Sequence, residues 1–175
     1  MNFTLKQKDD DFCLIHTNTN IINYAKKMVN VNLMSICLPE SEVKSLNENV
    51  SCFTSGERKW LNEEYWDYRR NDPIVPLNLL KPEKCEYTHL MDETKLCAGI
   101  QDHKTGNIKA YKGNLESNYG AALFCYDLKN KTPVLVGIAA KNHLSPQPNN
   151  PGIYTDVFKI KSKIQKQFCK YNDNV

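Results

Sequence analysis

The sequence predicts an all-β domain that is followed by one α-helix. From Ser51 onward, short predicted strands alternate with turn signals, which is the pattern of an all-β barrel. Residues 133–140 form an apolar run that predicts a buried strand. Near the end of the chain, Ile160, Ile164 and Phe168 recur every four residues and therefore share one face of a helix. We expect this stripe to pack on the core and not on a membrane.

Length and composition indicate a single globular domain. The chain has 175 residues, of which 41% are hydrophobic and 25% are charged, so it is long enough to bury a core. The formal net charge of +3 is spread along the sequence without a basic block, so nucleic acid is not expected as a partner. No apolar run approaches the roughly 20 residues of a membrane span, and the first residues do not form a signal peptide.

The cysteines do not indicate a metal site, and no cofactor is expected. They lack the short paired spacings of a zinc site. The seven positions are 13, 37, 52, 85, 97, 125 and 169. Three glycosylation sequons, which begin at Asn2, Asn49 and Asn130, favour a secreted glycoprotein.

Residues 117–125 carry a resemblance to a known family. Their sequence, Ser-Asn-Tyr-Gly-Ala-Ala-Leu-Phe-Cys, resembles the active-site segment G-D-S-G-G-P-L-V-C of trypsin-like serine proteases. Residues 11–15 resemble that family's D-I-A-L-L strand, residues 31–39 resemble its V-x-P-I-C-L-P connector, and residues 150–157 resemble its K-P-G-V-Y-T-x-V segment. The resemblance therefore covers nearly the whole chain.

This resemblance implies a chymotrypsin-like fold of which the chain holds only part. Residues 1–36 would be a remnant of the first barrel and the inter-barrel connector, with the polar stretch 17–32 running over the surface. Residues 37–175 would form the complete six-stranded second barrel with its C-terminal α-helix, in one peptidase-like domain. Within it, we expect a strand at 76–80, a short helix at 81–87 that carries Cys85, and a polar insertion at 101–116.

The family also implies which cysteines pair. Cys52 would pair with Cys125, and Cys85 with Cys97, a framework that belongs to an oxidising, extracellular compartment. Cys37 matches a cysteine that many relatives bridge to an N-terminal segment, so we expect it to pair with a second chain or an N-terminal half, or to stay unpaired. Cys13 and Cys169 have no common family equivalent, and a bridge between them is a hypothesis.

The active-site positions are degenerate. Aligned on Gly120 and Cys125, the nucleophilic serine falls on Tyr119 and the preceding aspartate on Asn118. A phenol cannot replace the serine hydroxyl, because its oxygen lies further from the backbone and its ring fills the substrate space. Asp11 matches the triad aspartate, whereas the catalytic histidine would lie upstream of this chain. Backbone donors of an oxyanion hole are expected at Gly120 and Tyr119.

The resemblance further implies an altered substrate pocket. Gly113 is the counted equivalent of its charged floor residue, so a floor that selects lysine or arginine is not expected. Ala140, Lys141 and Asn142 replace the S-W-G edge to which a substrate backbone pairs, which should impair strand addition. Gly152 is the fifth pocket-like position.

A surface segment at 59–70 is a candidate protein-binding site. Aromatic rings interleaved with arginine anchor many interfaces. The candidates are Trp60, Tyr65, Trp66, Arg69 and Arg70. The alternative is that Trp60 and Trp66 pack on the barrel as ordinary cover.

These expectations lead to an inactive homologue of trypsin-like endopeptidases. It would act by protein binding, as a decoy, cofactor or regulator in an extracellular proteolytic cascade such as immunity or clotting. A protease, an inhibitor or a cascade component would be its partner. The alternatives are an active secreted serine endopeptidase with unrecognised catalytic residues, and a degenerate product without a selected function.

Overall fold

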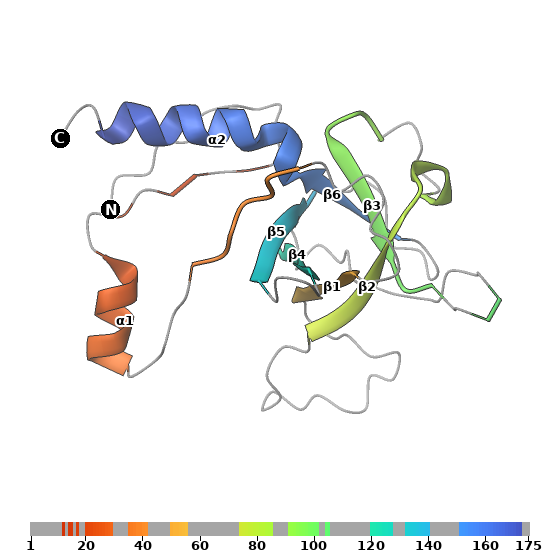
Figure 1. Ribbon diagram of the computed structural model, residues 1–175, viewed down its shortest axis with the longest axis horizontal. Helices are drawn as coiled ribbons and strands as arrows, with labels where there is room; N and C mark the ends of the chain where they lie inside the picture. Colours follow the sequence, from red (N-terminus) through yellow and green to blue (C-terminus); the bar gives the residue numbers. More distant parts are fainter. Residues whose placement is uncertain are drawn as a thin grey trace, which may run out of the picture.

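Six antiparallel strands close into a barrel in the computed structural model of the chain (Figure 1). The strands are β1 (Val50–Ser55), β2 (Ile74–Leu80), β3 (Lys95–Gly99), β4 (Ala122–Asp127), β5 (Thr132–Ala139) and β6 (Gly152–Asp156). Their order around the barrel is β1-β2-β3-β6-β5-β4, and β4 pairs with β1 to close it. The structure describes residues 12, 14, 15, 17, 20–29, 35–41, 50–55, 74–85, 91–101, 104, 105, 120–127, 132–140 and 151–172.

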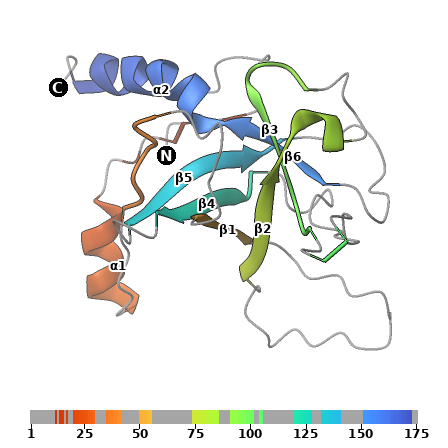
Figure 2. The same cartoon turned by 45° about the vertical axis from the view of Figure 1, so that its right-hand side comes forward.

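Within the described residues, two helices and one short turn of helix accompany the barrel. They are α1 (Ile21–Val29), the 3₁₀ turn η1 (Pro82–Lys84) and α2 (Val157–Asn172). In Figures 1 and 2, α2 lies along one side of the molecule and extends past the barrel, whereas α1 lies outside the barrel. The all-β barrel with a C-terminal helix is the fold that the sequence predicted, and this prediction is confirmed.

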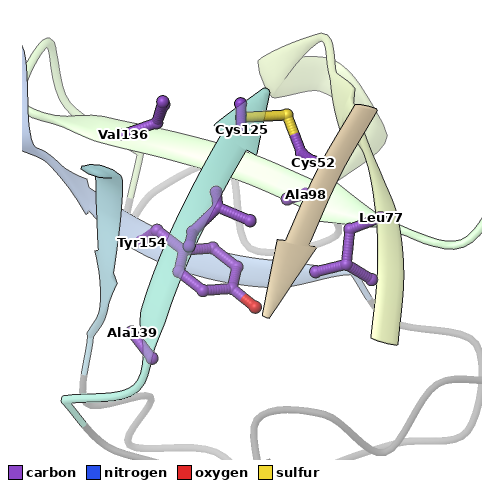
Figure 3. Packing of buried hydrophobic residues seen from close by; sticks show 8 residues of the cluster. Cys52, Leu77, Ala98, Cys125, Val136, Ala139 and Tyr154 are labelled. Carbon is purple, nitrogen blue, oxygen red and sulfur yellow. A yellow bond between two sulfur atoms is a disulfide. The ribbon is translucent and has the colours of Figure 1, made fainter. Parts of the chain in front are cut away.

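Alternate residues of the strands fill the barrel, because successive side chains of a strand point to opposite faces of the sheet. Figure 3 shows this core, in which the ring of Tyr154 occupies the interior and is only 1% exposed. The cluster consists of Cys52, Leu77, Ala98, Leu123, Cys125, Val136, Ala139 and Tyr154. Gly137 faces it from β5, and a Cβ added there would lie 2.9 Å from the Cβ of Tyr154. The glycine therefore makes room for the tyrosine.

A second core joins α2 to the barrel. Val157, Ile160 and Ile164 of α2 are buried, and Leu135 and Ile138 of β5 pack against them. The four-residue spacing predicted the burial of Ile160 and Ile164, whereas the side chain of Phe168, the third predicted residue, lies outside the described part. The connector residue Leu38 packs against the same cluster.

The connector also covers part of the edge of β5. Strand β6 pairs only with residues 137–139 of β5, so the first half of that strand has an open side. There the backbone N–H of Cys37 donates to the carbonyl of Pro133 at 3.4 Å, and the N–H of Leu135 donates to the carbonyl of Cys37 at 2.9 Å. The Nζ of Lys161 in α2 donates to the carbonyl of Pro39 at 2.9 Å. The connector is thus held by both the sheet and the helix.

One expectation for the first part of the chain is wrong. A strand was expected at 11–15, yet its described members, Phe12, Leu14 and Ile15, are not in a strand. Phe12 and Leu14 instead pack against the α2 cluster, so burial against the helix replaces pairing in a sheet.

The stretch 17–32 was expected to run over the surface, and most of its described residues are exposed, but the sequence did not predict that it contains α1. Asn20 caps this helix, because its Oδ1 accepts from the N–H of Asn23 at 3.1 Å. The asparagine before an apolar run was the signal that sequence reasoning missed. The short helix expected at 81–87 is the 3₁₀ turn η1, beyond whose end residues 86 and 87 lie outside the described part. The domain division at residue 36 stays a prediction.

The start of α2 depends on Asp156, which leads to a prediction. Its carboxylate accepts from the N–H of Phe158 at 2.9 Å, and the side chain is buried. We expect Asp156→Ala to lower the free energy of unfolding by about 1 kcal/mol, because a helix N–H loses its acceptor. Asp156→Asn should cost less, because an amide oxygen also caps. Urea denaturation followed by circular dichroism measures both.

The control for this prediction is Ser162→Ala on the exposed face of the same helix. It should change the free energy of unfolding by less than about 0.5 kcal/mol. Equal losses in Asp156→Ala and Ser162→Ala would contradict the capping role.

Candidate functional site

The segment that follows residue 119 enters β4 through a glycine turn. Gly120 has a φ of 82°, a conformation that side chains with a Cβ rarely adopt, although no atom lies within 4 Å of an added Cβ. The glycine is therefore required by the backbone conformation and not by crowding. The N–H of Gly120 donates to the carbonyl of Ala139 at 2.9 Å, and the N–H of Ala139 donates to the carbonyl of Ala121 at the same distance.

This bonding corrects one expectation for the oxyanion hole. Gly120 was expected to offer its backbone N–H to a ligand, but that N–H is already bonded to Ala139 at the end of β5. A donor that is satisfied within the sheet is not free to stabilise a developing oxyanion. The other expected donor, Tyr119, lies outside the described residues together with Asn118 and Asp11.

The Cys52–Cys125 disulfide fixes the other end of the same strand. Cys52 and Cys125 are directly opposite each other in the β1–β4 ladder, with Cα atoms 3.9 Å apart, and both are buried. Between the Gly120–Ala139 hydrogen bond and this disulfide, the Oγ1 of Thr54 donates to the carbonyl of Ala122 at 3.0 Å. The register of residues 120–125 is therefore fixed at both ends, and Tyr119 is the next residue toward the N-terminus.

The second disulfide lies beside two of the pocket-like positions. Cys85, at the end of η1, and Cys97, in β3, have Cα atoms 6.1 Å apart and are buried. Ala140 and Ile153 belong to the same buried cluster, and the N–H of Ala140 donates to the carbonyl of Ile153 at 3.0 Å. Gly152 is the neighbour of Ile153 and is also buried. Both predicted disulfides are confirmed.

The structure thus brings together only part of the predicted site. Ala140 and Gly152 lie next to each other at the junction of β5 and β6. The remaining pocket-like positions, Gly113, Lys141 and Asn142, lie outside the described residues. The same holds for the interface candidates Trp60, Tyr65, Trp66, Arg69 and Arg70 and for the sequon asparagines Asn2, Asn49 and Asn130.

Cys37 lies on the surface of the connector. Its backbone is bonded to β5, whereas its side chain is exposed and forms no disulfide with a cysteine of the described residues. Cys13 lies outside them, and of Cys169 only the backbone, within α2, is described. The hypothesis of a Cys13–Cys169 bridge stays a prediction.

Sequence reasoning missed an aromatic cluster on the outside of the barrel. Phe53 of β1 and Phe124 of β4 are opposite each other, and their ring centroids are 5.8 Å apart. The ring of Tyr126 lies 6.1 Å from both and is 37% exposed. Because their neighbours Cys52 and Cys125 point inward, the two-residue period of the strands places these rings outside. That period was the signal available in the sequence.

The described part of the chain was searched for a metal-binding group and for membrane-spanning helices. Within it, no group of three or more His, Cys, Asp or Glu side chains could hold a metal ion. None of its helices combines the length and the hydropathy that a membrane crossing requires.

Comparisons with known proteins agree with the barrel and its motifs. The family model described as Trypsin matches residues 1–164. Submandibular glandular kallikrein-3 of Rattus norvegicus is 29% identical over 178 residues, which cover 98% of this chain and 81% of the rat protein. A solved structure of kallikrein-related peptidase 10 has a TM-score of 0.51 and 19% identity, and the match covers 78% of this chain and 55% of that one. This chain therefore spans about half of the length of the solved structure, and the likeness to it shows the fold alone.

The exposure of Cys37 leads to a prediction about thiol reactivity. When the purified chain is treated with a maleimide under native conditions, we expect the Cys37 peptide to be labelled, because its side chain is exposed. Peptides that contain Cys52, Cys85, Cys97 or Cys125 should become labelled only after unfolding and reduction. Peptide mapping by mass spectrometry measures the labels.

The variant Cys37→Ser is the control, because it should lose this label while its unfolding midpoint stays unchanged. An unlabelled Cys37 peptide in the purified chain would contradict the exposed, unpaired state. The same map tests the Cys13–Cys169 hypothesis, which fails if either thiol takes up label without reduction.

Proposed function

Because the chain belongs to the trypsin family of serine proteases, we propose that it is a member that binds proteins without cutting them. The observation that carries this proposal is the tyrosine at position 119, directly before Gly120. In the resemblance to the family's G-D-S-G-G segment, that position belongs to the nucleophile. The proposal thus depends on the identity of one residue, at position 119, in a chain that has the barrel fold of the family.

Two anchors support the assignment of residue 119 to the nucleophile position. Position 120 holds a glycine whose φ of 82° a residue with a Cβ rarely adopts, and Cys125 pairs with Cys52 as the family pattern implies. A shift of the motif by one residue would move Cys125 to the opposite face of β4 and break this bond. The alternative nucleophile Ser117 is two residues away from the aligned position.

The chemistry of a phenol does not replace that of a serine hydroxyl. A serine attacks a carbonyl while a neighbouring imidazole accepts its proton. The phenol oxygen of tyrosine lies several bonds further from the backbone, and its lone pair is delocalised into the ring.

Asn118 supports the loss of the activation step as well. In the family, a new N-terminal ammonium forms an ion pair with the aspartate that this chain replaces by Asn118. An amide carries no charge, so it cannot compensate a buried ammonium. Cleavage of a precursor could not activate the chain by that route.

We infer that the function is the binding of a protein from an extracellular proteolytic cascade, such as immunity or clotting. A protease, an inhibitor or a cascade component would recognise the family fold, and the chain would act as a decoy, cofactor or regulator. The two buried disulfides favour an oxidising compartment. The exposed Cys37 is the site at which a second chain or an N-terminal half would be linked.

Activity-based labelling tests the loss of catalysis. The full chain is incubated with a fluorophosphonate probe and a panel of peptide substrates, with trypsin as the positive control. We expect no labelled serine and no cleavage, because residue 119 has no hydroxyl that an imidazole can activate. The variant Tyr119→Phe, which removes the phenol oxygen, should behave in the same way.

Two outcomes would overturn the loss of catalysis. A labelled serine, identified by mass spectrometry and lost in the corresponding alanine variant, would establish a nucleophile other than residue 119. Peptide cleavage that disappears in Tyr119→Phe would establish a catalytic tyrosine. Either result favours the secreted endopeptidase.

A binding experiment tests the proposed partner and site. The immobilised chain is incubated with the extracellular fluid of its source, and bound proteins are identified by mass spectrometry. We expect a protease, inhibitor or cascade component, and we expect Trp66→Ala with Arg69→Ala to lower its retention at least tenfold, because such side chains carry much of the binding energy of interfaces.

The control variant is Lys104→Ala, which changes an exposed residue outside the segment 59–70. It should retain the partner as the unchanged chain does. Retention that is unaffected by the Trp66 and Arg69 changes would reject this segment as the interface. The absence of any specifically retained protein would favour a product without a selected function.

A further inference from the structure

A strip of apolar side chains crosses the outside of the barrel over β2, β1 and β4. The core residues of these strands point inward, so the two-residue period of a strand places their neighbours outside. Tyr126 is 37% exposed and Ile74 is 62% exposed, whereas Phe53 and Phe124 are half-buried. We call the outer strip the set Ile74, Pro76, Phe53, Phe124 and Tyr126.

Pairing between the strands makes the outer strip continuous. Phe53 is directly opposite Pro76 on one side and Phe124 on the other. The rings of Phe53 and Phe124 are stacked, and the ring of Tyr126 is edge-on to both. A single exposed apolar residue needs no explanation, but a set of neighbours on one face indicates a surface that a ligand covers.

The chemistry of the outer strip favours a carbohydrate. All its members are neutral, so it offers apolar and aromatic contact without ion pairs. One face of a sugar ring presents weakly positive C–H groups, which suit the negative face of an aromatic ring. The sugar hydroxyls meanwhile stay in water, as a surface that is only partly buried requires.

A glycosylation sequon begins beside the outer strip. The sequence Asn49-Val50-Ser51 is a sequon, and Asn49 directly precedes β1. Ser51 is exposed and, by the two-residue period, shares the outer face of β1 with Phe53. It is directly opposite Tyr126 in the ladder between β1 and β4, a pairing that places Cβ atoms about 5 Å apart.

The sequon that begins at Asn130 has a different relation to the barrel. It is completed by Thr132, the first residue of β5. The two-residue period groups Thr132 with Val134 and Val136, which pack in the core, and not with the outer strip. This second sequon therefore supplies a matched comparison for the first.

We propose that Asn49 carries an N-linked glycan whose first sugars pack on the outer strip. The glycan comes from a lipid diphosphate donor of the secretory compartment. The amide nitrogen of Asn49 forms a bond to C1 of the first N-acetylglucosamine, the bond from C1 to the diphosphate oxygen breaks, and the amide loses one proton. The bulky glycan also keeps other proteins away from the strip. This proposal depends on the extracellular location proposed above and is independent of the loss of catalysis.

Peptide mapping tests whether Asn49 is modified. The full chain is purified from the extracellular fluid of its source and treated with a peptide-N-glycosidase in water enriched in a heavy oxygen isotope. The enzyme converts a glycosylated asparagine to labelled aspartate, and we expect this label in the Asn49 peptide. An unlabelled Asn49 peptide would reject the glycan. Absence of the chain from that fluid would instead reject the extracellular location.

A double-mutant cycle tests the packing on the ring of Tyr126. The full-length variants are secreted from cultured cells, and Asn49→Gln removes the glycan. With Tyr126 present, we expect Asn49→Gln to lower the midpoint temperature of thermal unfolding by about 2–4 °C. In the Tyr126→Ala background the shift should be below about 1 °C, whereas Tyr126→Phe, which keeps the ring, should retain it.

The control for this cycle is Asn130→Gln, which removes the other sequon next to the barrel. Any shift that it causes should be the same in the Tyr126→Ala background as with Tyr126 present. Tyr126→Ala should fold, because the side chain that it truncates is 37% exposed and outside the core.

Nitration of tyrosine gives a second readout, which does not depend on stability. With tetranitromethane under native conditions, we expect Tyr126 to react at least about threefold more slowly in the glycosylated chain than in Asn49→Gln, because the sugars cover its ring. Tyr24 of α1, which is 56% exposed, is the internal control, and its rate should not change.

Three results would overturn the packing. A shift from Asn49→Gln that is equal in the Tyr126→Ala background would show that the glycan acts without the ring. Equal nitration rates with and without the glycan would show that Tyr126 is uncovered. An extracellular protein that the glycosylated chain retains, and that Tyr126→Ala loses, would assign the outer strip to a protein interface.

Discussion

The closure of β1 against β4 is the constraint on which the rest of the structure depends. A six-stranded sheet that failed to close would expose two strand edges and the core between them. The ladder between these strands runs from Val50 opposite Asp127 to Thr54 opposite Leu123, and the Cys52–Cys125 bond lies within it. Closure buries Tyr154 inside the barrel and fixes the register of the segment that begins at Gly120. The candidate site is therefore located by the same contact that completes the barrel.

What the sequence predicted well are features with a strong local pattern. The apolar run at 133–140 and the spacing of Ile160 and Ile164 are set by burial, and burial leaves a periodic signal. These features gave a strand of the barrel and the C-terminal helix. The resemblance to the protease family, and not a periodic pattern, implied both disulfides.

What the sequence did not predict depends on contacts between distant segments. Phe12 and Leu14 were expected in a strand, yet nothing local records that α2 offers them a buried surface. The N–H of Gly120 was expected to be free. Its acceptor, the carbonyl of Ala139, is nineteen residues away in the chain, so the local sequence does not indicate this hydrogen bond. Helix α1 is a different case, because a local signal for it was present in the sequence. Asn20 before an apolar run indicates the start of a helix, but the polar composition of the stretch favoured a surface segment without a helix.

The fold of this chain and the chemistry of its candidate site follow from different physical demands. Residues of the core and the disulfides are constrained by packing, where a single misplaced methyl group is costly, as the 2.9 Å approach at Gly137 illustrates. The backbone conformation of Gly120 and the Cys52–Cys125 bond do not depend on which side chain stands at position 119. Helix α2 belongs to the packed part of the molecule, because Ile160 and Ile164 fix one of its faces against β5 and the connector. Packing therefore fixes the fold independently of the residue at position 119, and the chemistry of the site needs a test of its own.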